Sequence, residues 1–163
     1  MAPKGLDTRP TSDRVREATF NALESRGALV DARILDLFAG SGALGIEALS
    51  RGAAHATFVD HDRGALDAIR ANLDATGLAG FATVVAWDAA EYLERGNGEA
   101  VDVVFLDPPY AFDQWAELLD HVPGDLAVIE SDRPIEPGEM WEMAREKRYG
   151  TTVVAIFRRR SPY

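Results

Sequence analysis

The feature that most constrains the fold is a short apolar run that ends in two consecutive prolines. The run Val101-Asp102-Val103-Val104-Phe105-Leu106 is rich in β-branched and aromatic residues, which predicts a strand buried on both faces. It leads directly into Asp107-Pro108-Pro109-Tyr110. Because proline lacks an N–H group and restricts the residue before it, the strand must end at Asp107. A carboxylate therefore lies on a stiff turn at the carboxyl end of a strand, where open α/β sheets bind ligands.

The chemistry of this turn suits a planar group that carries an amine. An exocyclic amine offers two N–H donors, and the Asp107 carboxylate with the adjacent carbonyl groups offers acceptors for them. Tyr110 adds a flat face on which a nucleobase can stack. An ordinary Pro-Pro turn at the start of a loop is the alternative that the turn alone leaves open.

The rest of the chain alternates between strand and helix patterns. We expect a helix from Asp13 to Leu23, capped by Thr11 or Ser12. Strands are expected at residues 32–37, 54–59, 81–86, 101–106 and 126–129, helices at 43–50, 63–76, 89–95 and 112–121, and an antiparallel pair at 143–149 and 152–158. This order predicts an α/β, Rossmann-like fold: a mainly parallel seven-stranded sheet with a C-terminal antiparallel hairpin and helices on both faces.

Length and composition favour one globular domain in a reducing compartment. The chain has 163 residues, 47% of them hydrophobic, and no cysteine, so we expect an extended leader at 1–11 and a single domain at 12–163. No apolar run reaches the roughly 20 residues of a membrane helix and no signal peptide opens the chain. We therefore expect a cytoplasmic protein that does not bind membranes, and we expect a monomer.

The charge is unevenly distributed. The net charge is −10, but residues 140–163 hold six basic and two acidic residues, a balance of +4, and residues 1–26 are balanced at +1. The two ends could converge on one basic rim that binds nucleic acid. Solvated ends on an acidic protein explain the same pattern equally well.

A glycine-rich turn follows the first expected strand. Gly40-x-Gly42-x-x-Gly45 matches the dinucleotide fingerprint, and Asp60 lies 20 residues beyond Gly40, where an acid that binds ribose is expected. A nicotinamide dinucleotide and S-adenosylmethionine both fit this pattern, and a tight turn without a ligand is the third possibility.

Acids at the ends of the strands favour S-adenosylmethionine over a nicotinamide dinucleotide. Asp36 precedes the glycines by four residues, where it would repel a pyrophosphate but would suit the α-amino group of S-adenosylmethionine. Asp88 ends the third expected strand and could accept a hydrogen bond from an adenine amine. Together with Asp60 and Asp107, these acids fit an adenosyl donor opposite an amine acceptor.

Three segments resemble one known family. Residues 34–53, Ile-Leu-Asp-Leu-Phe-Ala-Gly-Ser-Gly-Ala-Leu-Gly-Ile-Glu-Ala-Leu-Ser-Arg-Gly-Ala, are similar to the first motif of the RsmD-type 16S rRNA guanine-N2 methyltransferases. Residues 9–21 resemble the segment that precedes this motif, and Asp107-Pro-Pro-Tyr110 resembles the family's catalytic turn. The resemblance implies a class I methyltransferase that uses S-adenosylmethionine, releases S-adenosylhomocysteine, and methylates a guanine N2 amine in 16S rRNA of the assembling small subunit.

The resemblance also implies a role for individual residues. The target base would be held by Asp107, Pro108, Pro109 and Tyr110. The donor would be held by Asp36, Phe38, Ala39, Gly40, Ser41, Gly42, Asp60, His61, Asp88 and Ala89. RNA would be bound by Arg9, Thr11, Arg14 and Arg16. No metal is expected, since His55, His61 and His121 show no ligand spacing and are expected at the surface.

Other functions remain open at this point. The Asp-Pro-Pro-Tyr turn is shared with DNA adenine-N6 and cytosine-N4 amino-methyltransferases. A nicotinamide dehydrogenase is a rival that leaves this turn unexplained. A module that binds the donor without catalysis is the alternative from another class.

Overall fold

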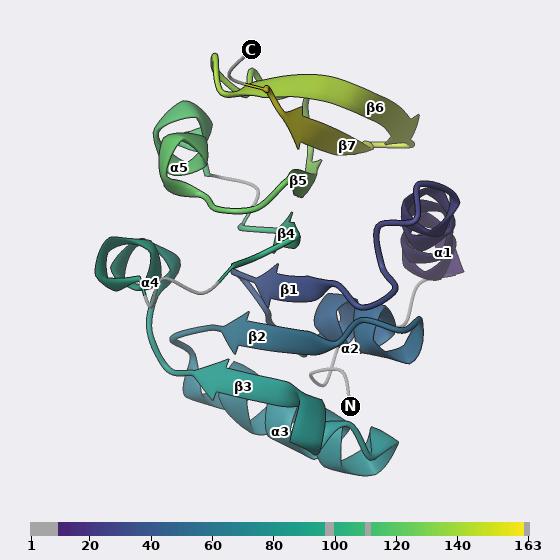
Figure 1. Ribbon diagram of the computed structural model, residues 1–163, viewed down its shortest axis with the longest axis vertical. Helices are drawn as coiled ribbons and strands as arrows, with labels where there is room; N and C mark the ends of the chain where they lie inside the picture. Colours follow the sequence, from purple (N-terminus) through teal and green to yellow (C-terminus); the bar gives the residue numbers. More distant parts are fainter. Residues whose placement is uncertain (1–9, 97–99, 110–111, 162–163) are drawn as a thin grey trace.

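The structure is a computed structural model that describes residues 10–96, 100–109 and 112–161, with only the backbone at 10–12. Seven strands form one sheet, shown in Figure 1. They are β1 (Arg33–Asp36), β2 (His55–Val59), β3 (Ala82–Val85), β4 (Val103–Leu106), β5 (Leu126–Ser131), β6 (Trp141–Tyr149) and β7 (Thr152–Arg159).

The order of the strands is β3-β2-β1-β4-β5-β7-β6. The first five strands of the chain are parallel, whereas β7 runs antiparallel to both β5 and β6. The order reverses between β1 and β4, and such a switch point is where open α/β sheets bind ligands at the carboxyl ends of their strands. The predicted mainly parallel sheet with a C-terminal antiparallel hairpin is confirmed.

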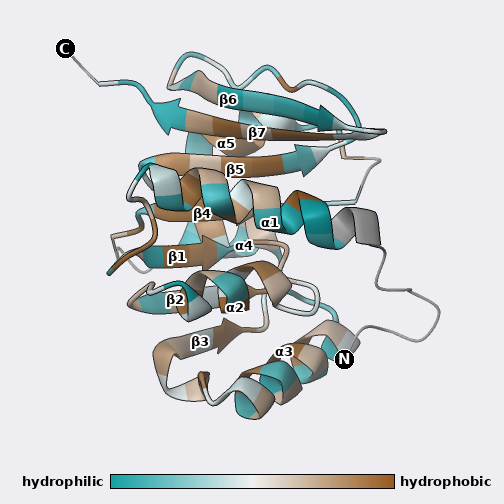
Figure 2. Ribbon diagram, turned by 90° about the vertical axis from the view of Figure 1, so that its right-hand side faces the viewer, coloured by the Kyte–Doolittle hydropathy of each residue, from teal (hydrophilic) through white to brown (hydrophobic). Residues whose placement is uncertain are grey.

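Helices cover both faces of the sheet. On one side lie α1 (Pro10–Ser25), α2 (Ala43–Ser50) and α3 (Arg63–Thr76), and on the other lie α4 (Ala89–Arg95) and α5 (Trp115–His121). A short 3₁₀ helix, η1 (Ala79–Phe81), precedes β3. Along β4 the side chains alternate between the two layers: Val103 and Phe105 pack with α1, and Val104 and Leu106 pack with α5. Figure 2 shows how the hydrophobic strands lie behind α1 and α2.

Local signals account for several helix boundaries. The helices α2, α3 and α4 have the predicted bounds. Asp62 caps α3 by accepting a hydrogen bond from Ala65 N at 2.8 Å, and Gly77 ends that helix with a positive φ of 72°.

Two helices begin elsewhere than expected. The helix α1 begins at Pro10, so it reaches into the segment expected to be an extended leader, and proline suits a first helical position because its missing N–H is not needed there. The helix α5 begins at Trp115 rather than at Phe112, because Phe112 N donates to Pro109 O at 2.9 Å and closes a turn. Among the described residues, no helix is both long enough and apolar enough to cross a membrane.

Candidate active site

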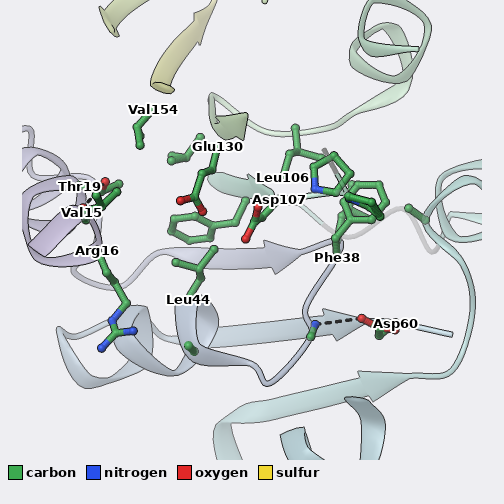
Figure 3. A pocket seen from close by; sticks show the side chains of 18 of the residues that line it. Val15, Arg16, Thr19, Phe38, Leu44, Asp60, Leu106, Asp107, Glu130 and Val154 are labelled. Atoms are coloured by element: carbon green, nitrogen blue, oxygen red, sulfur yellow. Dashed lines mark hydrogen bonds between the residues drawn. The ribbon is translucent and has the colours of Figure 1, made fainter. Parts of the chain in front are cut away.

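A cavity of about 690 Å³ opens at the carboxyl edge of the sheet, at the switch point (Figure 3). Its wall is built by the ends of β1, β2, β4 and β5, by the loop before α4, and by one side of α1. The lining side chains include four acids, Asp60, Asp88, Asp107 and Glu130. The volume is typical of a pocket for a small organic ligand.

The three glycines of the fingerprint have different tasks. Gly40 has a φ of 56° and lines the cavity, and a Cβ there would meet nothing within 4 Å. Gly42 has a φ of 83° and lies at the N-cap of α2. Gly45 is required for packing, since a Cβ there would lie 2.3 Å from Phe58 Cε1. Only the first glycine is therefore placed to approach a ligand with its backbone.

Asp60 links β2 to the glycine turn. Its Oδ2 accepts a hydrogen bond from Gly40 N at 2.9 Å, and its Oδ1 accepts one from Asp62 N at 2.9 Å. A carboxylate has about four acceptor positions, so both oxygens retain capacity for hydroxyl groups of a ligand in the cavity.

Asp36 lies beneath the glycine turn and is not among the residues that line the cavity. Its side chain is 1% exposed, and its Oδ2 accepts a hydrogen bond from Gly45 N at 3.1 Å. Burial raises the pKa of Asp36 to about 7; the bond from Gly45 opposes this shift and the charge of Asp60 adds to it. Asp36 therefore supports the first turn of α2 and does not present a carboxylate to the cavity.

Asp88 is the N-cap of α4 and lines the cavity. Its Oδ1 accepts a hydrogen bond from Glu91 N at 2.7 Å. This bond fixes the side chain by local helix chemistry, and it leaves acceptor capacity on the carboxylate for a donor group in the cavity.

Asp107 and Glu130 face each other in the cavity, as Figure 3 shows. Asp107 is accessible from the cavity, while protein surrounds it on its other sides. Desolvation raises the pKa of Asp107 to about 8, with further increases from the charge of Glu130, a side-chain hydrogen bond with Glu130, and the charge of Asp36. Such a shift in a cleft is typical of functional groups.

The helix α1 closes one side of the cavity. Val15 and Thr19 line it, and Thr19 Oγ1 donates to Val15 O at 2.7 Å. Arg16 also lines it, but its guanidinium is paired with Asp13 at 3.2 Å and with Glu47 at 3.7 Å. The strongest cation at the cavity is therefore partly neutralised.

The structure brings many, but not all, of the expected site residues together. The cavity is lined by Phe38, Gly40, Asp60, His61, Asp88, Ala89, Asp107, Pro108, Pro109 and Arg16. Asp36, at the end of β1, and Ala39, Ser41 and Gly42 of the loop that follows are not in the lining. Arg14 is exposed on α1. Arg9, Tyr110 and the side chain of Thr11 lie outside the described residues.

Glu130 is the one acid of the cavity lining that the sequence analysis missed. A signal was available, because Glu130 follows an apolar run in the same way as Asp36, Asp60, Asp88 and Asp107 follow theirs. The histidines gather at no common site: His61 and His121 are exposed, while His55 is half-buried, with Nε2 lying 3.0 Å from Thr83 Oγ1. Within the described ranges, no group of three or more potential ligands is placed to hold a metal ion.

Comparisons with known proteins place the chain among relatives of similar length. The model of the family described as conserved hypothetical protein 95 matches residues 1–158. YlbH of Bacillus subtilis (strain 168) is 40% identical over 172 residues, which cover 98% of this chain and 92% of that protein. The ribosomal RNA small subunit methyltransferase D of Escherichia coli (strain K12) is 39% identical over 167 residues, covering 96% and 82%.

Solved structures agree with this assignment. The Escherichia coli protein yhhF superimposes with a TM-score of 0.82 at 39% identity, covering 94% of this chain and 88% of that one. This chain therefore belongs to the conserved hypothetical protein 95 family, and the resemblance to the RsmD-type methyltransferases that residues 9–21, 34–53 and 107–110 suggested is confirmed.

Proposed function

We propose that this protein transfers a methyl group from S-adenosylmethionine to the N2 amine of a guanine in 16S rRNA. The observation that carries the proposal is that one cavity joins a glycine turn, with Asp60 and Asp88, to the Asp107-Pro108 turn. The relative named ribosomal RNA small subunit methyltransferase D supports small-subunit rRNA as the substrate.

The lining of the cavity fits this donor better than a dinucleotide. Four acids line the cavity, and the arginine of the lining, Arg16, is already paired with the carboxylates of Asp13 and Glu47. A pyrophosphate would meet uncompensated negative charge here, whereas a cationic sulfonium is attracted. Asp60 would accept the ribose hydroxyls and Asp88 would accept the adenine amine.

The role first expected for Asp36 is revised in this proposal. Its carboxyl group is buried under the loop, so it would act through Gly45 and the start of α2 rather than by contact with the amino group of the donor. The backbone at Gly40, which lines the cavity, is placed to approach the donor instead.

Asp107 and Pro108 would position the acceptor. When bound, S-adenosylmethionine supplies an electrophilic methyl group, so the protein mainly has to align a nucleophile with it. The Asp107 carboxylate and the Pro108 carbonyl would accept the two amine hydrogens and direct the nitrogen lone pair toward the methyl carbon. As the N–C bond forms and the S–C bond breaks, the fixed carboxylate stabilises the positive charge that develops on nitrogen.

Asp107 would then receive the proton that leaves the methylated nitrogen. Its raised pKa favours this acceptance, and the neighbouring Glu130 can accept a hydrogen bond from the protonated carboxyl group. Tyr110, beyond the described residues, would stack on the base after it leaves its helix or loop.

Transfer of labelled methyl from S-adenosylmethionine tests the proposal, with naked 16S rRNA, assembling small subunits and DNA compared side by side. Product analysis should locate the label on guanine N2 in one of the two RNA arms. Label only in DNA would favour an amino-methyltransferase of DNA. A melting temperature raised by NAD but not by S-adenosylmethionine would favour a dehydrogenase.

A further inference from the structure

The strand β6 is one of the two edges of the sheet, and its last part carries two cations on the face that continues from the cavity. The register pairs Lys147 with Val154 of β7, and Val154 with Glu130 of β5. Paired residues of neighbouring strands point to the same side. Since Val154 and Glu130 both line the cavity, Lys147 lies on the same face, two strand spacings or roughly 10 Å from Glu130.

Arg145, two residues before Lys147, lies on the same face of β6. Arg145 is paired with Ile156, which is paired with Val128, a lining residue of the cavity. Tyr149 lies on this face as well, paired with Thr152. We call Arg145, Lys147 and Tyr149 the basic face of β6.

The opposite face of this part of β6 has a different charge. Glu146 and Arg148 alternate with the basic face and are paired with Ala155 and Val153. One acid and one base balance there, whereas the basic face carries two cations and no acid within residues 145–149. Over residues 145–149, the two faces of the strand therefore differ in net charge by two.

Among the residues that the structure describes, the side chains of the basic face have hydrogen-bonding groups without partners. Neither Arg145 nor Lys147 forms an ion pair with any residue that the structure describes. Arg145 Nη1 and Tyr149 Oη are buried atoms that find no hydrogen-bond partner there, a condition that is rare in native proteins. On β7, by contrast, Arg158 is paired with Glu142 at 2.8 Å and Arg159 donates to Gly124 O and Val122 O.

The helix α1 adds a cation on the same side. Arg14 and Arg16 are two positions apart and so point in nearly opposite directions around the helix. Arg16 is paired with Glu47 of α2, so Arg14, which is exposed, lies on the side of α1 that faces away from α2. Arg26 joins the two elements at their other end by donating to Ala144 O at 3.2 Å. Figure 2 shows α1 in front of β4, with β5 between it and the β6–β7 hairpin in this view, and the hairpin turn at the end of the sheet where the parallel strands finish.

We propose that the basic face of β6, together with Arg14, binds the phosphate backbone of the RNA whose target base enters the cavity. This inference rests on the proposed function, because it names the surface that would hold the rest of that substrate. A base inside the cavity leaves its phosphates at the mouth, and a rim of unpaired cations is the surface that phosphates select. It also explains how a chain of net charge −10 can hold RNA: the acids of the cavity wall serve the reaction, and the cations lie beside it.

Lys147→Glu and Arg148→Glu form a matched pair that tests the proposal. Both side chains are exposed neighbours on one strand, and both reversals change the net charge equally. Binding to a fluorescent 16S rRNA transcript is measured at several KCl concentrations. We expect Lys147→Glu to weaken binding about tenfold and to lower the slope of log K against log salt by about 1, while Arg148→Glu changes affinity less than about twofold.

The outcomes separate this inference from the proposed function. If both reversals weaken binding equally, the effect is one of net charge and the assignment to one face is wrong. If wild-type protein transfers methyl to RNA but Lys147→Glu binds like wild type, the inference alone fails. If wild-type protein binds S-adenosylmethionine but neither binds nor methylates RNA, the proposed function fails. Lys147→Arg keeps the positive charge and should bind like wild type, and a wild-type melting temperature of Lys147→Glu would exclude damage to the strand as the cause.

Discussion

Asp107 and Glu130 are brought together by the register of two adjacent parallel strands. Leu106 of β4 is paired with Ile129 of β5. The residues that follow, Asp107 and Glu130, therefore lie next to each other where they line the cavity. The charge of Glu130 disfavours the ionised form of the neighbouring Asp107, because like charges repel. Desolvation by the surrounding protein, together with the charge of Glu130, raises the pKa of Asp107 to about 8, which makes Asp107 a proton acceptor suited to neutral and mildly alkaline pH.

The pair predicts the pH dependence of methyl transfer. Asp107 must be ionised to accept the amine hydrogens, so the single-turnover rate should rise with pH and level off above about 8. In Glu130→Gln the neighbouring charge is absent, the pKa of Asp107 falls, and the profile should shift to lower pH. A profile that Glu130→Gln leaves in place would show that Glu130 does not act on Asp107.

The buried Asp36 predicts an unusual pH dependence of stability. Its folded-state pKa of about 7 lies above the ordinary value of 3.8, so the native state holds this proton more tightly than the unfolded state. The contribution of the protonated Asp36 carboxyl group to the free energy of unfolding is fully present below about pH 4 and is lost as the pH rises through 7. Asp36→Asn keeps an acceptor for Gly45 N but cannot ionise. Urea unfolding should therefore find Asp36→Asn more stable than wild type at pH 8, by a few kcal/mol at most, and no more stable at pH 4. Equal stability of the two proteins at pH 8 would mean that Asp36 ionises without penalty.

Local chemistry made much of the fold predictable. The bounds of α3 follow from the Asp62 cap and from Gly77, and β4 was evident because a run buried on both faces is apolar at every position. Both signals are contained within a few consecutive residues. The convergence of Asp60, Asp88 and Asp107 was also predictable, since parallel strands end at one edge.

What the sequence did not indicate depends on contacts between distant segments. The role of Glu130 requires that β5 lie beside β4 in one register. The burial of Asp36, the last residue of β1, depends on how the glycine turn after the strand folds over its side chain and brings Gly45 N within hydrogen-bond distance. The separation of charges on β6 depends on the bulge between Met143 and Arg145, which changes the face on which every later side chain lies.

The close packing of Gly45 against Phe58 predicts that any side chain at position 45 destabilises the protein. An alanine Cβ would lie 2.3 Å from Phe58 Cε1, and Phe58 is fully buried, so β2 and α2 would have to separate. We expect Gly45→Ala to lower the free energy of unfolding by about 1–3 kcal/mol in urea titrations. Gly80→Ala is the control, because a Cβ there meets nothing within 4 Å, and it should lie within about 0.5 kcal/mol of wild type. Equal effects of both substitutions would show that the close approach of Phe58 is not required.

Asp60 predicts a defect confined to donor binding. Its carboxylate holds Gly40 N and Asp62 N and lines the cavity, so Asp60→Ala removes an acceptor for ribose and loosens the loop that carries Gly40. The dissociation constant for S-adenosylmethionine, measured by calorimetry, should rise roughly tenfold or more, as expected for losing a hydrogen bond to a charged group. Asp67→Ala, on α3 and outside the cavity lining, should leave it unchanged. Affinity that survives Asp60→Ala would refute its contact with the donor.

For Asp107 we predict the opposite result: methyl transfer is lost while binding of the donor is retained. Asp107→Ala removes the acceptor that aligns the amine, while Gly40, Asp60 and Asp88 on the donor side remain. Methyl transfer should fall by at least about a hundredfold, the usual contribution of a group that stabilises developing charge, with the dissociation constant for S-adenosylmethionine changed less than about threefold. Asp107→Asn refines the test, because an amide still accepts one amine hydrogen but cannot take up the proton. Its rate should therefore stay low and lose its dependence on pH between 6 and 9, whereas a rate that still rises with pH would assign the titrating group to another residue.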